Sequence, residues 1–379
     1  MEYQNILIIK MSSVGDVLHA LPTAAAIRDR FPAARISWLV HPQFAAFVPE
    51  PPIIDEIIYF DKVAFKKMSW SEKWHFVKEF RAQLHAKHFD LVIDLQGLFK
   101  SGAVAFLTGC ANKIGYCEMR EGSNLVSEPI VGEHAEDHVI ERYLDVARYL
   151  GAEVRGVHFP LPDLSRERSQ IRAMLTAAGI KLVQQQKDIF GHIVRGKSRK
   201  ATFPVLNAQG GLVPSPYVVL AIGARWETKK WPQEHFAKLG RMLIDDGYAV
   251  VLLGGKEDIR CGEIVRELAN FPKEMLDLTG KTTLRQAAAL IDDSVFYVSA
   301  DTGPLHIATA LKKPLVALYG PTKPNRTGPY GDRWATVIVS PMECRGCLKK
   351  QCNNWHCMYK ITPEYVYEII KKKMEAQHG

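Results

Sequence analysis

Short apolar runs alternate with stretches of helical periodicity along most of this chain. In the first part the apolar runs lie at residues 5–10, 36–40, 56–59 and 91–94, and helical patterns lie near residues 71–87, 137–150 and 165–178. In the second part the apolar runs lie at residues 217–221, 248–253, 294–300 and 314–318. Apolar runs of this length, separated by helices, are typical of parallel strands buried on both faces. The pattern predicts an α/β protein with two parallel sheets.

Two of these strands are followed by polar turns that contain a glycine. The run at 294–300 leads into residues 301–306, and the run at 5–10 leads into residues 12–19. A helix that begins directly after a strand points its free N–H groups at the carboxyl edge of the sheet, where anions and ligands bind. The aspartate in each turn could alternatively be a helix cap. Because the two turns are far apart in sequence, we infer two similar halves whose clefts face each other.

Four segments resemble the motifs of the ADP-heptose:lipopolysaccharide heptosyltransferases, glycosyltransferase family 9. They are SSVGDVLHALP at 12–22, DLQGLFKS at 94–101, KKWP at 229–232 and DTGPLH at 301–306, and they occur in the family's order. The resemblance covers most of the chain apart from roughly residues 181–213. It implies a GT-B fold, in which two Rossmann-like domains with parallel sheets face each other across a central cleft. It also implies an inverting transfer of heptose from an ADP-sugar without a metal in the chemistry.

The resemblance and the pattern together divide the chain into four parts. We expect an acceptor-binding domain over residues 1–180 and an ADP-sugar-binding domain over residues 214–361. Between them, the polar residues 181–213 form a linker or an inserted loop. The last part, residues 362–379, is predicted to be a helix that could pack back on the first domain.

Composition and charge narrow the class of partner. The 379 residues carry a formal net charge of +8, which favours an anionic partner such as nucleic acid, a membrane surface or an acidic glycolipid. We find no aromatic and basic stripe of the kind that RNA-binding modules use, and we expect no nucleic acid partner. No segment reaches the roughly 18 uninterrupted apolar residues of a membrane helix. With the resemblance, we expect a cytoplasmic enzyme that binds peripherally to the cytoplasmic face of the inner membrane and acts on the lipopolysaccharide core.

Glycosyl transfer needs a base for the acceptor hydroxyl and stabilisation of the leaving diphosphate. Asp16 is the predicted base, because it follows the first strand at the carboxyl edge of a sheet. The chain contains no Asp-x-Asp, the metal-chelating pair of many other glycosyltransferases. We therefore assign the diphosphate to Lys229 and to the backbone of Thr302 and Gly303. Lys229 taken alone could be a surface lysine, and its KKWP context favours the functional role through the resemblance.

Further predicted ligand contacts follow from the same motifs. They are Ser13, Gly15, Glu257, Asp301, Thr302, Gly303, Pro304, Leu305 and His306. Glu257 could accept hydrogen bonds from the ribose hydroxyls or could stabilise its own helix start. His306 could face the diphosphate or bind a backbone carbonyl. The sequence Ala224-Arg225-Trp226 departs from relatives that have small hydroxyl residues before the lysine, and this departure leaves the detailed donor contacts open.

Seven cysteines include a cluster at Cys344, Cys347, Cys352 and Cys357. Four closely spaced thiolates could hold a structural zinc ion, although free thiols or disulfides are the alternatives and a reducing cytoplasm disfavours permanent disulfides. The resemblance requires no metal for catalysis, and the only small molecule it requires is the ADP-heptose donor.

A phosphate-loop pattern at residues 191–198 is a misleading match. The residues satisfy GxxxxGK[ST], but a glutamine-rich stretch precedes them and no helix pattern follows. A functional phosphate loop joins a buried strand to a helix. We therefore reject it, and note that the chain has no GxGxxG motif of a dinucleotide-binding oxidoreductase. Two alternatives to heptose transfer stay open: a GT-B enzyme using another nucleotide sugar or acceptor, and a non-catalytic nucleotide-binding protein.

Overall fold

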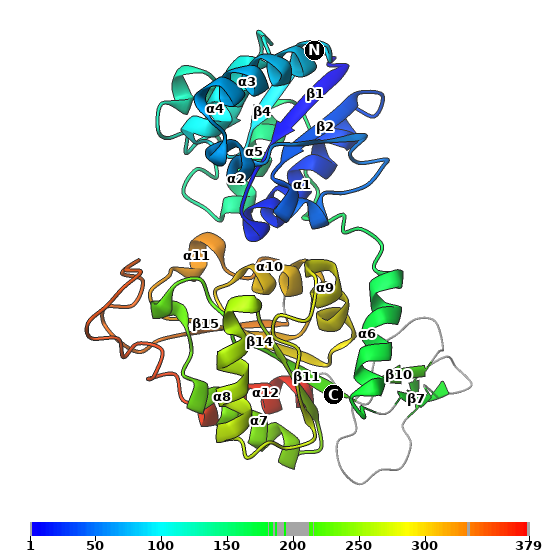
Figure 1. The fold of residues 1–379 in the computed structure, drawn as a ribbon, viewed down its shortest axis with the longest axis vertical. Coiled ribbons are helices and arrows are strands. Elements are labelled where there is room, and N and C mark those ends of the chain that lie inside the picture. The colour runs from blue at the N-terminus through cyan, green and yellow to red at the C-terminus, as the bar shows by residue number, and fades with distance from the viewer. Residues whose placement is uncertain are drawn as a thin grey trace. The chain divides into compact units, whose positions relative to one another are not determined.

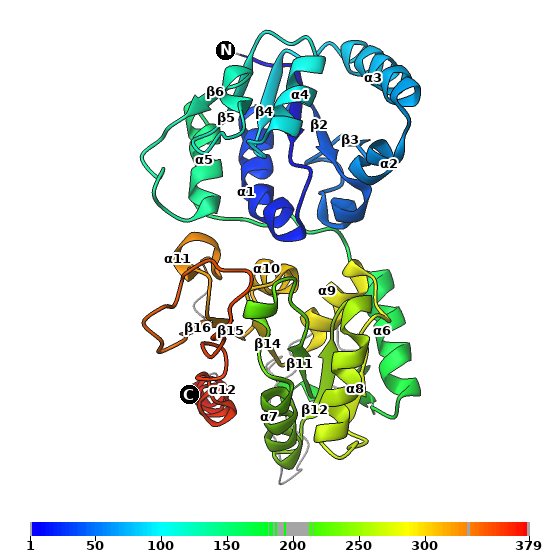
Figure 2. The same ribbon diagram turned by 60° about the vertical axis from the view of Figure 1, so that its left-hand side comes forward.

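The computed structural model describes residues 2–180, 216–331 and 334–376, together with the backbone of short segments at 182–184, 186–187, 193–194 and 212–214. The chain divides into two compact units, Met1–Pro162 and Asp163–Gly379. Each unit is a six-stranded parallel sheet covered by helices (Figures 1 and 2). The two-sheet α/β fold that the sequence predicts is confirmed.

The first unit has the strand order β3-β2-β1-β4-β5-β6. Successive strands are added on one side of β1 up to β3 and then on its other side from β4 onward. Its strands are β1 (Asn5–Ile9), β2 (Arg35–Val40), β3 (Glu56–Tyr59), β4 (Leu91–Asp94), β5 (Lys113–Tyr116) and β6 (Glu128–Ile130). Its helices are α1 (Val14–Arg30), α2 (Lys62–Lys67), α3 (Trp70–His85), α4 (Phe99–Leu107) and α5 (Val139–Tyr149). In open parallel sheets, ligands bind at the carboxyl edge where the strand order changes side in this way.

Both faces of this sheet are covered, which explains why β1 is apolar throughout. On one face, Leu7 and Ile9 share a core cluster with Phe80 and Leu84 of α3 and with the buried side of α4. On the other face, α1 packs against α5 (Figure 2). A strand that must bury both sides cannot alternate polar and apolar residues, so its sequence is a continuous apolar run.

The second unit repeats the strand order as β13-β12-β11-β14-β15-β16. Its strands are β11 (Tyr217–Ala221), β12 (Ala249–Leu253), β13 (Met275–Asp277), β14 (Phe296–Ala300), β15 (Leu315–Tyr319) and β16 (Ala335–Val339). Its helices are α6 (Ser165–Ala177), α7 (Gln233–Asp245), α8 (Ile259–Leu268), α9 (Leu284–Asp293), α10 (Gly303–Ala310), α11 (Pro324–Thr327) and α12 (Pro363–Ala376). Short 3-10 helices at Glu227–Lys229 and Lys256–Asp258 follow β11 and β12.

Two helices belong to a different unit from the one the sequence suggests. The boundary falls at Pro162 rather than near residue 180, because α6 packs against α9 and Arg168 forms ion pairs with Asp292 and Asp293. The final helix α12 packs on α7, and its Val366 is fully buried in the core of the second unit. These contacts lie within the second unit.

Few residues of the predicted linker or inserted loop are described. β7 (Leu182–Gln184) pairs with β10 (Leu212–Pro214), and β8 (Gln186–Lys187) pairs with β9 (Ile193–Val194), both antiparallel. Of the phosphate-loop match at 191–198, all but Ile193 and Val194 lie outside the described residues.

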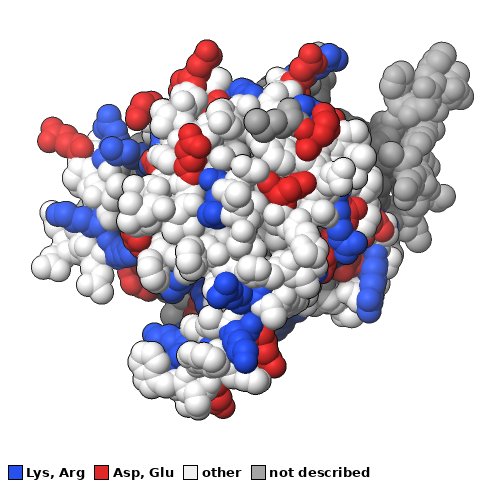
Figure 3. Space-filling model, turned by 90° about the horizontal axis from the view of Figure 1, so that it is seen from above, with Lys and Arg blue, Asp and Glu red and all other residues white. Residues whose placement is uncertain are grey.

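The helices and the surface charges can be compared with the expected membrane and nucleic acid partners. No helix in the described part of the chain combines the length and apolar character needed to span a bilayer. On the face seen in Figure 3, Lys and Arg side chains are interspersed with Asp and Glu side chains. The excess positive charge therefore forms no continuous basic stripe on that face.

Candidate active site

At the carboxyl edge of the first sheet, α1 begins immediately after the turn that follows β1. Ser13 is its N-cap and Asp16 occupies the third helical position, an arrangement known as a capping box. One oxygen of Asp16, Oδ2, accepts hydrogen bonds from the Ser13 backbone N–H at 2.7 Å and from the Ser13 hydroxyl at 2.8 Å. Among the described residues, the second oxygen makes no hydrogen bond. Asp16 thus caps the helix with one oxygen while the other can accept a proton or a hydrogen bond from a ligand.

A buried polar cluster that sequence reasoning missed supports this edge. Lys10, which is 1% exposed, donates from Nζ to the Leu95 carbonyl at 2.7 Å and to the Tyr143 hydroxyl at 2.6 Å. Burial lowers the pKa of Lys10, and the nearby charges of Asp16 and Asp94 oppose that shift. Burial raises the pKa of Asp94, although two backbone N–H groups donate to its Oδ1. These contacts fix the strand end from which the Asp16 turn departs.

The second unit has a pocket at the carboxyl edge of its sheet, with a volume of about 290 Å³. Its lining residues come from the ends of β11 and β12, from the start of α9 and from the start of α10. This volume lies at the small end of the range for small-molecule sites. The structure therefore has a cavity at the sheet edge where the strand and turn pattern predicts a ligand site.

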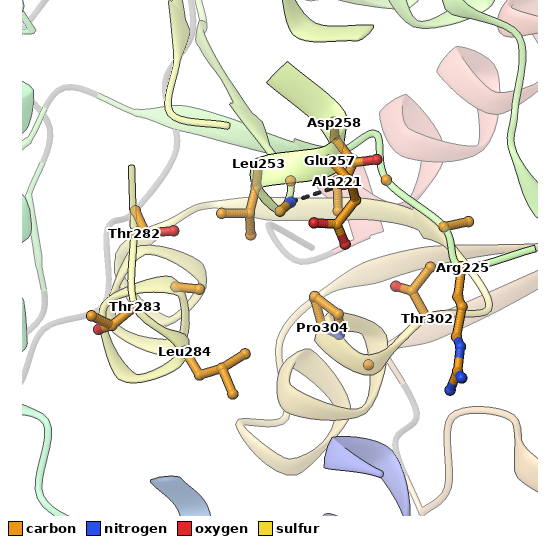
Figure 4. Close-up of a pocket in the computed structure, with 16 residues that line it drawn as sticks. Ala221, Arg225, Leu253, Glu257, Asp258, Thr282, Thr283, Leu284, Thr302 and Pro304 are labelled. Atoms are coloured by element: carbon orange, nitrogen blue, oxygen red, sulfur yellow. Dashed lines mark hydrogen bonds between the residues drawn. The ribbon is translucent and has the colours of Figure 1, made fainter. Parts of the chain in front are cut away.

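The two ends of this pocket differ in chemistry. Figure 4 shows Thr282, Thr283 and Leu284 at one end, and Thr302 and Arg225 at the other. Leu284 makes the first end apolar, and Leu253 and Ala287 are further apolar residues of the lining. One end suits a flat heterocycle and the other end suits an anion.

The carboxylate of Glu257 lies over Gly255 and projects into the pocket between these ends (Figure 4). A Cβ atom at Gly255 would approach Glu257 Oε2 to 2.6 Å, so a side chain at this position would displace the carboxylate. Glu257 is exposed and can accept two hydrogen bonds from a ligand that carries adjacent hydroxyl groups.

Asp258 forms part of the pocket floor and was missed by sequence reasoning. Its Oδ2 accepts a hydrogen bond from the Gly255 N–H at 2.8 Å, and burial raises the pKa of this carboxyl. A Cβ atom at Gly223 would lie 2.0 Å from the same oxygen. Glycine is therefore required at position 223 by the close approach of the Asp258 carboxylate.

The side chain of Lys229 is held by Asp301. Its Nζ donates to Asp301 Oδ2 at 2.7 Å and to the Asp301 carbonyl at 3.3 Å, and lies 4.5 Å from the centre of the Trp226 ring. Lys229 is not among the residues that line the pocket. Its ammonium neutralises a buried carboxylate directly before α10 and keeps a negative charge from facing an incoming anion.

The first turn of α10 presents fewer donors than a typical helix start. Thr302 is the N-cap, and Pro304 has no N–H group. The N–H of Leu305 is bonded to the Thr302 carbonyl at 3.1 Å, and the Leu305 side chain is fully buried away from the pocket. The donors that this turn can offer an anion are therefore concentrated at Thr302 and Gly303. His306 is buried nearby, with Nε2 3.9 Å from Asp301 Oδ1.

Arg225 is the cation that lines the pocket itself. It is exposed, and among the described residues its guanidinium makes no hydrogen bond or ion pair. Figure 4 shows its side chain running beside Thr302. A guanidinium supplies several donors in a plane and binds phosphate oxygens in pairs. In the sequence Arg225 stands out only as a departure from relatives, in the turn after β11.

Comparison with known proteins decides the family. The model of glycosyltransferase family 9 (heptosyltransferase) matches residues 77–357. The chain belongs to glycosyltransferase family 9. Lipopolysaccharide heptosyltransferase 1 of Pseudomonas aeruginosa is 27% identical over 361 residues, which cover 92% of this chain and 87% of that protein. Lipopolysaccharide heptosyltransferase 2 of Escherichia coli is 27% identical over 369 residues, which cover 96% and 97%.

Solved structures agree with this membership. The Escherichia coli heptosyltransferase WaaC with ADP is 25% identical and superposes with a TM-score of 0.69, covering 98% of this chain and 100% of that one. Escherichia coli ADP-heptose lipopolysaccharide heptosyltransferase II, at 24% identity, shares the fold with a TM-score of 0.70 over the whole of both chains. The resemblance read from four motifs is confirmed, and the family 9 chain is a glycosyltransferase.

The cysteine cluster of this family 9 chain does not form a metal site in the part of the chain that the structure describes. Cys344, Cys347 and Cys352 are exposed free thiols, and Cys357 is half-buried with its pKa raised by burial. Among the described residues, no three His, Cys, Asp or Glu side chains are grouped as metal ligands. The structural zinc considered from the spacing therefore has no support.

The segment that carries these cysteines has a visible structural role instead. Its Lys349 carbonyl accepts a hydrogen bond from the Thr228 hydroxyl at 2.7 Å, and Trp355 Nε1 donates to the Thr228 carbonyl at 3.0 Å. The segment thereby braces the short helix that ends at Lys229.

Proposed function

We propose that this chain transfers heptose from ADP-heptose to the inner core of lipopolysaccharide with inversion at the anomeric carbon. The observation that carries the proposal is the pocket of the second unit, which combines an apolar end, a carboxylate above a glycine and an anion-binding end. Membership of family 9 supports heptose as the sugar. The WaaC structure with ADP supports an adenine nucleotide as the carrier.

In the proposed complex the donor lies along the pocket with its adenine at the apolar end and its diphosphate at the anion-binding end. The adenine lies toward Leu284 and Ala287, the ribose hydroxyls donate to Glu257, and the diphosphate meets Thr302, Gly303 and Arg225. Lys229 acts through Asp301, because it cancels a charge that would otherwise repel the diphosphate. The anion end stabilises the charge that grows on the leaving ADP with groups already in place, which is the efficient form of electrostatic catalysis.

Asp16 is the proposed base. Its oxygen that is not used in capping accepts the proton of the acceptor hydroxyl as the hydroxyl oxygen bonds to the anomeric carbon. The bond from that carbon to the diphosphate oxygen breaks at the same time, and its electron pair leaves with ADP. General-base assistance of this kind contributes about 10²- to 10⁴-fold to the rate. Arg225 and the backbone donors of Thr302 and Gly303 meet the charge of the diphosphate, and Lys229 neutralises Asp301 beside them, so the proposed mechanism needs no metal.

The acceptor is an anionic glycolipid, and we place the enzyme peripherally on the cytoplasmic face of the inner membrane. The lipopolysaccharide heptosyltransferases that this chain resembles support that acceptor. A positively charged chain suits a phosphorylated acceptor.

The test is transfer onto defined truncated cores with ADP-heptose, compared with UDP- and GDP-sugars as donors. Transfer from ADP-heptose alone is expected, and it should survive EDTA with the fold intact. Preference for a UDP- or GDP-sugar would point to a family 9 enzyme with another donor. ADP binding without transfer onto any core would leave a non-catalytic nucleotide-binding protein. Activity lost in EDTA and restored by Mg²⁺ would contradict the metal-free mechanism.

A further inference from the structure

Helix α3 of the first unit carries two exposed tryptophans. Trp70 is 88% exposed and Trp74 is 69% exposed, and they lie one helical turn apart on the same side. The later turns of α3 anchor the helix to the sheet through Phe80 and Leu84. The fold therefore does not need the tryptophans, and large aromatic side chains left in water on one helix side indicate a contact surface.

The neighbouring helix α4 extends this surface. Phe99 and Phe106, two turns apart, are 65% and 70% exposed. Helices α3 and α4 contact each other and contribute to the same core cluster on one face of the sheet (Figure 2). We call Trp70, Trp74, Phe99 and Phe106 the aromatic face.

Basic side chains lie beside the two tryptophans of the aromatic face. From residue 62 to residue 81 the chain has six lysines and arginines against two glutamates. Lys73 Nζ lies 5.7 Å from the centre of the Trp70 ring, and Lys78 Nζ lies 5.8 Å from that of Trp74. Interfacial helices combine tryptophan with lysine in this way, because the rings enter the headgroup region while the ammonium groups reach anionic headgroups.

The two glutamates reduce the formal charge of this stretch without cancelling it, because six lysines and arginines against two glutamates leave an excess of positive charge. Glu72 accepts the Ser69 N–H as part of the α3 capping box, and Glu79 lies 3.0 Å from His75 Nε2. Both carboxylates are therefore engaged within α3 or at its start, while Lys66 and Lys67 are exposed at the end of α2.

We infer that the aromatic face docks on the surface of an anionic phospholipid bilayer, with Trp70 and Trp74 in the headgroup region. The inference rests on the proposed function in that a lipopolysaccharide acceptor is carried in a bilayer. Helices α3 and α4 begin at the same sheet edge as α1, and Lys62 Nζ of the adjoining α2 donates to Ser12 Oγ at 3.4 Å. Docking on this face brings the edge that carries Asp16 to the membrane surface.

Vesicle co-sedimentation of the full chain tests the docking. Wild-type protein should bind phosphatidylcholine vesicles that contain phosphatidylglycerol and bind pure phosphatidylcholine far more weakly. Trp70→Ala/Trp74→Ala should lose binding by about tenfold or more, since both rings supply apolar burial. Lys66→Glu/Lys67→Glu should abolish the preference for anionic vesicles.

The matched control is Tyr149→Ala. Tyr149 is 59% exposed on α5, which packs with α1 on the opposite face of the sheet, so this variant should bind as wild type does. Equal vesicle binding by the double tryptophan variant would overturn the inference. So would a wild-type dimer in light scattering that the tryptophan variant lacks, because a second copy would then be the occupant.

Transfer to a lipid-free core oligosaccharide separates this inference from the proposed function. The double tryptophan variant should keep transfer to the soluble acceptor while it loses vesicle binding. Vesicle binding by a chain with no transfer activity would leave the aromatic face in place and remove the proposed function. Loss of soluble transfer together with normal vesicle binding in the tryptophan variant would assign the aromatic face to the sugar acceptor and overturn the docking.

Discussion

The two sheets have the same strand order, but their carboxyl edges carry different chemistry. In the first, the edge is built around a buried lysine, Lys10, and a helix start capped by Asp16. In the second, the edge is lined by glycines and opens into a pocket with Glu257 and Arg225. The shared topology places a functional edge in each unit, and the side chains at the strand ends decide what each edge can bind.

Both edges also contain a carboxylate beside a lysine, and here the difference is instructive. Asp94 is fully buried, and its pKa is raised by burial although Lys10 lies nearby. Asp301 is also buried but is bonded directly to Lys229. The first arrangement braces the backbone under the turn that carries the proposed base, whereas the second cancels charge next to the proposed anion-binding end of the pocket. The following predictions test this division of roles.

The largest expected effect is the loss of turnover in Asp16→Asn. Turnover should fall by about 10²- to 10⁴-fold while ADP binding to the second unit stays normal. Loss of the cap should also lower the free energy of unfolding by about 1 kcal/mol. Steady-state kinetics, ADP calorimetry and thermal unfolding measure the three quantities.

A matched control separates catalysis from capping. Glu72 occupies the same third helical position in the capping box of α3, and its Oε2 accepts the Ser69 N–H at 2.6 Å. Glu72→Gln should lose similar stability and keep turnover on a soluble acceptor. If both variants lose turnover equally, Asp16 is only a cap and the first edge has no catalytic role.

The second effect concerns the charge pair at the anion end. Lys229→Ala leaves the buried carboxylate of Asp301 without its partner and should weaken ADP binding by about 10- to 100-fold in calorimetry. A bulky replacement of Gly303 should weaken it as well, because it blocks close backbone approach. Neighbouring Lys230 pairs with the exposed Glu227, and Lys230→Ala should change ADP affinity by less than about twofold. Equal losses at both lysines would show that only general positive charge matters.

A third effect distinguishes the units by their response to acid. Burial alone would raise the pKa of Asp145, but hydrogen bonds from His134 and Arg148 outweigh it and lower that pKa below its ordinary value of 3.8. A lowered carboxyl pKa stabilises the fold above the ordinary value, and this stability is lost as the pH falls through the lowered pKa. In the second unit, the carboxylates with lowered pKa, Asp163 and Glu364, are exposed.

We therefore expect the first unit to lose stability before the second as the pH drops below about 4. Hydrogen exchange measured separately for β1 and β11 reports the two units. Asp145→Asn should cost about 1–3 kcal/mol near neutral pH and should flatten the acid dependence of the first unit. An unchanged acid dependence in that variant would assign the sensitivity to other groups.

The sequence predicts the central strands well, because a strand buried on both faces must be apolar throughout. Runs at 91–94 and 217–221 match β4 and β11 residue for residue. The edge strands β6 and β13 have only three residues each, too few for a pattern to identify. The expected boundary near residue 180 differs from the division at Pro162, because α6 packs against α9, which lies far along the chain and cannot be paired with α6 from sequence.

The positions of the two polar turns could be predicted from the sequence, but the pairings of their side chains could not. The turns that carry Asp16 and Thr302 lie where the motifs indicate, because strand ends are visible in sequence. The bond between Lys229 and Asp301 joins residues 72 positions apart and exists only in the folded chain. Arg225 belongs to no strand or helix pattern, so the sequence does not indicate that its side chain lines a pocket. What the sequence lacks is therefore the long-range contact that turns a polar residue into a ligand-binding one.

The smallest expected effect tests whether ADP binds at the carboxyl edge of the second sheet without help from the phosphate-loop pattern. Lys197 completes the phosphate-loop pattern and lies outside the described residues. The pocket of the second unit has its own anion end at Thr302, Gly303 and Arg225, so Lys197→Ala should leave ADP affinity unchanged in calorimetry. Arg225→Gln, measured beside it, should weaken ADP by about tenfold because a phosphate-binding guanidinium is removed. A large loss at Lys197 with none at Arg225 would move the nucleotide site away from the carboxyl edge of the second sheet.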